Sequence, residues 1–108
     1  MSEDIYVSIM RGTQTTPIAN NVFIQLDKMS SNEAASYQGS DPHFTYKAYT
    51  TTLSTVNPIL VLFRDYMVDL NVIDPITDMY RRYLIVNDPE CHTLDSHWQW
   101  VCTRVRGT

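Results

Sequence analysis

The second half of the chain consists of short apolar and aromatic runs that are separated by Asp-Pro pairs. One run covers residues 58–70, and another, residues 80–86, lies between Asp74-Pro75 and Asp88-Pro89. Proline fixes its own φ and has no backbone N–H, so an Asp-Pro pair ends a strand and starts a turn. This pattern is typical of a small antiparallel β-protein.

Four other segments have a strand-like composition. Residues 5–10 and 22–26 are short and apolar, and residues 43–53 are rich in threonine and aromatic side chains, which favour strands. Residues 97–106 alternate, so that Trp98, Trp100 and Cys102 lie on one face. We predict that this face points into the core. The opposite face would then lie outside, where it could contact a neighbouring subunit; it carries Gln99, Val101, Thr103 and Val105.

The length of 108 residues suits one domain with one core. Residues 27–42 are polar and form either a long loop or a short-helix insertion, because Ser30 and Glu33 have capping-box spacing but no long apolar repeat follows. We therefore predict a mainly β fold, a small antiparallel β-barrel of about six strands with at most one short helix.

No residue pattern indicates an enzyme or a metal site. The polar segment 88–97 contains Cys91, His92 and His97, but adjacent residues on an extended chain point to opposite faces and cannot easily share one ion. A catalytic pair of Cys91 with His97 or His43 would need a third orienting group, which no motif supplies. We expect no cofactor, and we expect Cys91 and Cys102 to be reduced thiols.

The net charge and the N-terminal sequence narrow the possible locations and functions of the chain. The acidic start of the chain and the absence of a long apolar run predict synthesis in the cytoplasm without membrane insertion. A net charge of -4 argues against a general nucleic-acid binder. An oligonucleotide-binding barrel that stacks bases on aromatic side chains stays open as an alternative; its platform would use Tyr46, Tyr49, Trp98 and Trp100. Arg81 and Arg82 are expected to pair with Asp74, Asp78 or Asp88.

The C-terminal half resembles a known family. The strand pattern of residues 58–66, the Asp-Pro-x-Thr-Asp hairpin of residues 74–78 and the run Tyr-Arg-Arg-Tyr-Leu-Ile-Val of residues 80–86 are similar to the head-completion proteins of tailed bacteriophages. These are the head-closure, or stopper, proteins of the head–tail connector. The resemblance covers residues 58–108, and this chain has Asp78 where such hairpins often carry glycine.

The resemblance implies a structural role in the neck of the virion. Stopper proteins are small β-barrels that form homo-oligomeric rings beneath the portal and adaptor, join the tail and retain DNA with a loop in the channel, without sequence-specific contacts. For this chain the resemblance implies a channel loop with Lys28, Ser31, Asn32, Glu33, Tyr37 and Gln38. Candidate residues for the subunit interface are Gln99, Val101, Thr103, Val105, Arg81 and Arg82. A tail terminator is a related alternative, whereas a mostly helical adaptor does not fit.

Overall fold

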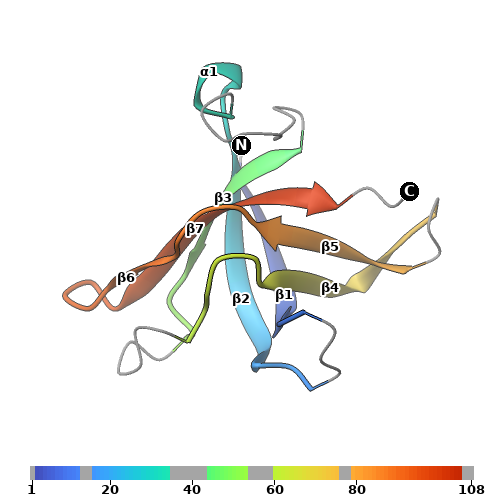
Figure 1. Cartoon of the computed structure of the whole chain (residues 1–108), viewed down its shortest axis with the longest axis horizontal. Helices are drawn as coiled ribbons and strands as arrows, with labels where there is room; N and C mark the ends of the chain where they lie inside the picture. Colours follow the sequence, from blue (N-terminus) through green and yellow to red (C-terminus); the bar gives the residue numbers. More distant parts are fainter. Residues whose placement is uncertain (1, 13–15, 35–43, 54–59, 76–78, 106–108) are drawn as a thin grey trace.

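Seven β-strands and one helical turn make up the regular structure in the computed structural model, which describes residues 2–12, 16–34, 44–53, 60–75 and 79–105 (Figure 1). The helical turn α1 spans Ser31–Ala34. The strands are β1 (Ser2–Met10), β2 (Ala19–Lys28), β3 (Thr45–Thr50), β4 (Tyr66–Asp74), β5 (Met79–Ile85), β6 (Glu90–His92) and β7 (His97–Val105). The predicted fold class, mainly β with at most one short helix, is confirmed.

Six of the strands close into an antiparallel barrel. Their order is β3–β2–β1–β4–β5–β7, and the pairing of β3 with β7 joins the two ends of the sheet. The remaining strand, β6, pairs with the first part of β7, next to the part of β7 that pairs with β5. Closure pairs backbone groups that an open sheet would leave exposed at its edges.

The barrel interior is filled by alternating residues of the strands. Trp98, Trp100 and Cys102 of β7 are at most 2% exposed and belong to the same buried cluster as Ile24 and Met67. The indole N–H of Trp100 donates to the Met67 sulfur at 3.0 Å, which gives this polar group a partner inside the core. The prediction that the tryptophan face points inward is confirmed.

Two predicted boundaries are wrong. Residues 60–65, the first described residues of the apolar run 58–70 predicted as a strand, form turns and bends, and β4 begins only at Tyr66. The predicted polar insertion 27–42 starts later than expected, because Asp27 and Lys28 still belong to β2 and pair with β3. Residues 35–42 of this insertion lie outside the described part of the chain. The β4–β5 turn does begin at Asp74-Pro75, as predicted.

Two hairpins extend beyond the barrel in opposite directions, β4–β5 to the right of Figure 1 and β6–β7 to the left. β1 pairs with β4 only up to Asp69, and β7 pairs with β5 only from Arg82 onward. Between Asp69 and Ile73 the register shifts, so residues 70–72 form a bulge in β4. Residues 70–75 and 79–80 therefore form a two-stranded arm, whose outer edges have no other strand beside them in the described part of the chain.

Candidate interaction surfaces

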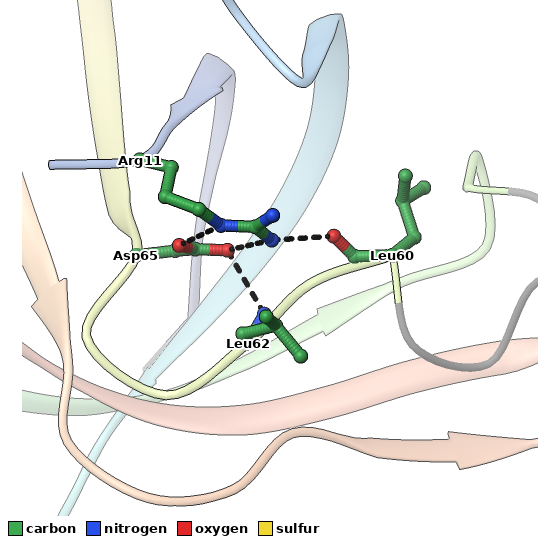
Figure 2. Close-up of polar contacts among 4 residues, drawn as sticks. All are labelled: Arg11, Leu60, Leu62 and Asp65. Carbon is green, nitrogen blue, oxygen red and sulfur yellow. Dashed lines mark hydrogen bonds and ion pairs between the residues drawn. The ribbon is translucent and has the colours of Figure 1, made fainter. Parts of the chain in front are cut away.

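An ion pair fixes the loop of residues 60–65, here called the pinned loop, to the end of β1 (Figure 2). Arg11 Nε donates to Asp65 Oδ1 at 2.9 Å, and Arg11 Nη2 donates to Asp65 Oδ2 at 3.0 Å. The same Nη2 also donates to the carbonyl oxygen of Leu60 at 3.1 Å. The carboxylate is only 2% exposed, and its hydrogen bond to the guanidinium raises the pKa of Arg11. A two-pronged bond of this kind fixes both distance and orientation.

The backbone of the pinned loop is held from both sides. The Leu62 N–H donates to Asp65 Oδ2 at 2.9 Å, and the Asp65 N–H returns a bond to the Leu62 carbonyl. The Arg64 N–H donates to the carbonyl oxygen of Ile85 in β5, and the Ile85 N–H donates to the carbonyl oxygen of Asp65. Arg64 has a φ of 72°, a left-handed conformation that non-glycine residues rarely adopt. The bonds on either side hold the loop in this costly conformation.

The tip of the pinned loop carries exposed apolar side chains. Leu62 is 42% exposed and Phe63 is 45% exposed, whereas Val61 beside them is buried in the core. The Arg64 guanidinium lies 5.1 Å from the centre of the Phe63 ring. Two large apolar groups on a rigid loop lose little conformational entropy on binding, so this tip is suited to docking against a complementary surface.

The arm carries a second, larger apolar surface. Leu70, Ile73, Met79 and Tyr80 are each about half exposed, at 53%, 57%, 52% and 48%. Three of them line an open hollow of about 480 Å³ together with Val68 and Arg82. Clusters of exposed apolar side chains on a projecting element are characteristic of interaction sites.

The predicted interface residues of β7 are only partly available. Val101 is 4% exposed, because it packs against Met29 and Val86 outside the barrel. Its N–H donates to Asn87 Oδ1 at 2.8 Å. The expectation that Val101 lies on an open outer face is therefore wrong. Gln99, Thr103 and Val105 are partly exposed, and their place in an interface stays a prediction.

Arg81 and Arg82 lie on β5 at the base of the arm. Arg81 is opposite Asp69 in the register, and Arg82 is opposite Val68. The Arg82 guanidinium lies 5.3 Å from the centre of the Tyr66 ring. Between described side chains, no ion pair links either arginine to Asp88, and pairing with Asp74 or Asp78 stays a prediction. The Asp74 side chain and Asp78 lie outside the described part.

The described residues of the predicted channel loop lie at the end of β2 and in α1. Ser30 Oγ accepts from the Glu33 N–H at 3.3 Å and donates to Glu33 Oε1 at 3.2 Å, so this part of the predicted capping box is present. Glu33 also forms an ion pair with Lys47 of β3 at 3.0 Å, and this bond lowers the pKa of Glu33. Lys28 ends β2, and Asn32 is exposed in α1 with Ser31 at its start. Tyr37 and Gln38 lie outside the described residues.

The segment that raised the question of a metal site forms the β6–β7 hairpin. His92 and His97 stack face to face with ring centres 4.5 Å apart, and His92 contacts Glu90 at 3.1 Å. Among the described residues, no group of three His, Cys, Asp or Glu side chains could hold a metal ion. Cys91 is partly buried, and burial strongly raises the pKa of the Cys102 thiol. Neither cysteine forms a disulfide.

Comparison with known proteins gives no match: no family model, no curated protein and no solved structure is similar enough to this chain. Within the described residues, no helix is both long enough and apolar enough to cross a membrane. The surfaces themselves are therefore the basis for a functional proposal.

Sequence reasoning missed the pinned loop and the arm. The pairing of Arg11 with Asp65 joins residues 54 positions apart, and no local pattern predicts it. One signal was present: the adjacent charged residues Arg64 and Asp65 interrupt the run 58–70 after Phe63, and Asp favours turns over strands. The exposure of Ile73 and Met79 depends on how far β1 and β7 extend beside the hairpin, which the sequence does not indicate.

Proposed function

We propose that this chain is a ring-forming structural protein of a tailed-phage neck, a stopper that closes the DNA channel and joins head to tail. The observation that carries the proposal is the projecting arm, which exposes four large apolar side chains beyond a closed barrel. A barrel of this kind buries its own core completely and does not need the arm. The arm is therefore better suited to contacts with another protein subunit.

Other features support the same proposal. Residues 58–108, which resemble the stopper proteins, contain β4, β5 and β7 and thus both apolar surfaces. The net charge of -4 suits a conduit, because a basic lumen would retain the passing DNA.

The oligonucleotide-binding alternative loses its proposed platform. Trp98 is 0% exposed and Trp100 is 2% exposed, so neither ring can stack on a base. Tyr46 and Tyr49 remain partly exposed, but Tyr46 packs edge-on against Tyr83 at 5.9 Å. The tryptophans of this barrel cannot stack on bases unless β7 unfolds.

Electron microscopy of particles that carry a tagged chain tests the proposal. We expect density for the tag in a ring between head and tail. Particles without the chain should have filled heads that lose DNA and carry no tail. Tails of uncontrolled length would instead indicate a tail terminator, and a chain absent from the particle would contradict any role in the neck.

A further inference from the structure

The pinned loop and the arm lie at opposite ends of the β4–β5 hairpin. The loop directly precedes Tyr66 at the start of β4, whereas the arm surrounds the turn at Pro75 (Figures 1 and 2). The pinned loop is held by hydrogen bonds and exposes Leu62 and Phe63, and the arm has an open, mainly apolar hollow. We propose that the tip of the pinned loop, Leu62 and Phe63, docks into the arm hollow of a second copy of this chain. This inference deepens the proposed function and rests on it.

Both surfaces are mainly apolar. The hollow is lined by four apolar or aromatic residues, Val68, Ile73, Met79 and Tyr80, and by the charged Arg82. Its volume of about 480 Å³ is sufficient for the two side chains of the loop tip. The aromatic ring of Phe63 can pack against Met79 and Tyr80, contacts that sulfur and aromatic groups favour.

A contact between two different surfaces has a consequence for assembly. When the loop of one subunit binds the arm of the next, the first subunit keeps a free arm and the second keeps a free loop. Subunits then add head to tail, and the chain of subunits closes into a ring if the rotation between neighbours permits. A contact of arm with arm would instead stop at a dimer.

The available area predicts a weak pairwise contact. Aromatic side chains bury roughly 150–250 Å² each, so half-exposed large side chains contribute at most on the order of 100 Å² each. The three exposed arm side chains that line the hollow and the two of the loop tip then supply on the order of 500 Å², below the roughly 1,200 Å² of a stable interface. One contact alone is therefore transient. A closed ring, in which every subunit has two contacts, is more stable by multivalency.

Sedimentation analysis of the full chain up to about 1 mM tests this inference, since weak contacts of this size have dissociation constants in the micromolar to millimolar range. We expect concentration-dependent association of the natural chain. Phe63→Asp and Tyr80→Asp should each weaken it at least about tenfold, because each places a charge in a desolvated apolar contact. Leu94→Asp is the matched control. Leu94 is 99% exposed in the β6–β7 turn, so this variant should associate like the natural chain.

A mixture of Phe63→Asp with Tyr80→Asp separates this arrangement from others. The first variant keeps an intact arm and the second an intact loop, so the mixture should form one-to-one dimers and nothing larger. Association of Phe63→Asp alone at the natural strength would show that the loop is not part of the contact. Loss of association only in Leu94→Asp would assign the contact to the β6–β7 hairpin.

A natural chain that stays monomeric to 1 mM also overturns the inference. The proposed function fails by a different result, absence of the chain from the neck of the particle.

Circular dichroism of each variant must match that of the natural chain, and Leu62→Asp provides a second loop variant if Phe63→Asp does not fold. Cysteine pairs at positions 63 and 79, on a Cys91→Ser background, should form a disulfide between copies rather than within one.

Discussion

At the scale of single residues, the buried carboxylate of Asp65 has the clearest energetic consequence. Its two oxygens accept three hydrogen bonds, two from Arg11 and one from the Leu62 N–H. A carboxylate that is 2% exposed is costly unless such donors surround it. The Arg11 side chain is 39% exposed, so solvent weakens the pair relative to one that is fully buried.

Replacing Arg11 with Met should lower the free energy of unfolding by about 1–3 kcal/mol, because Asp65 loses two of its three donors. Asp65→Asn should cost a similar amount. The double variant should cost less than the sum of the two, since each change removes the same interaction. Urea unfolding of the four chains measures this coupling, and additive effects would contradict it.

The burial of a second residue, Tyr83, makes the free energy of unfolding depend on pH. Burial raises the pKa of Tyr83 from 10.0 to about 12. Above pH 10 the unfolded chain therefore loses this proton, while the folded chain keeps it up to about pH 12. The folded state binds more protons in this window, so the free energy of unfolding should fall as pH rises, by up to roughly 3 kcal/mol for a shift of two pKa units.

Urea unfolding between pH 9 and pH 12 tests this dependence. Tyr83→Phe keeps the ring but removes the ionisable hydroxyl, so its free energy of unfolding should fall less steeply over the same window. Equal slopes for both chains would assign the alkaline loss of stability to other groups.

At the scale of elements, β7 organises the molecule. β3 pairs along one edge of β7, and β5 and β6 share the other edge. Its inner face supplies the two tryptophans of the core. The outer face is not uniformly open, because Met29 and Val86 cover Val101.

Val101→Asp should therefore unfold the chain rather than leave a folded monomer. A charged side chain without a partner at a site that is 4% exposed costs about 3 kcal/mol or more. The matched control is Val105→Asp, four residues later on the strand and half-buried, which should cost about 1 kcal/mol or less. Thermal unfolding followed by circular dichroism measures both. A folded Val101→Asp chain would mean that Met29 and Val86 move away easily.

The strands and their inner faces follow from local alternation, which is why the tryptophan face of β7 could be predicted from the sequence. Period-two patterning fixes the two faces of a strand, but it does not reveal what packs on the outside. Met29 covers Val101 only because β2 ends beside β3, a relation between distant segments. For the same reason the Arg11–Asp65 pair and the arm were not predictable, whereas the Asp74-Pro75 turn and the Ser30–Glu33 capping contact were.

At the scale of the whole molecule, stability should differ between barrel and arm. Barrel strands have neighbours on both sides. In the described part of the arm, Ile73 and Asp74 pair only with Tyr80 and Met79, and residues 70–72 form the bulge. An isolated two-stranded hairpin is marginally stable. We expect arm amides to exchange hydrogen with solvent far faster than those of residues 22–26 or 98–102, which should open only with global unfolding. Mass spectrometry of hydrogen exchange tests this. Equal protection in dilute protein would contradict it.

Closure of the barrel through β3 and β7 also determines when the protein can fold. These strands pair residues such as Thr45 with Thr103 and Thr50 with Trp98, across about half of the chain. Contacts of such long sequence separation form slowly, typically in milliseconds to seconds. During synthesis, β1, β2 and β3 emerge before the strand that completes their sheet, and until Val105 has emerged the edge of β3 stays open to other chains. Newly made copies are therefore most prone to mispairing just before the barrel closes, when a chaperone that shields strand edges would help most.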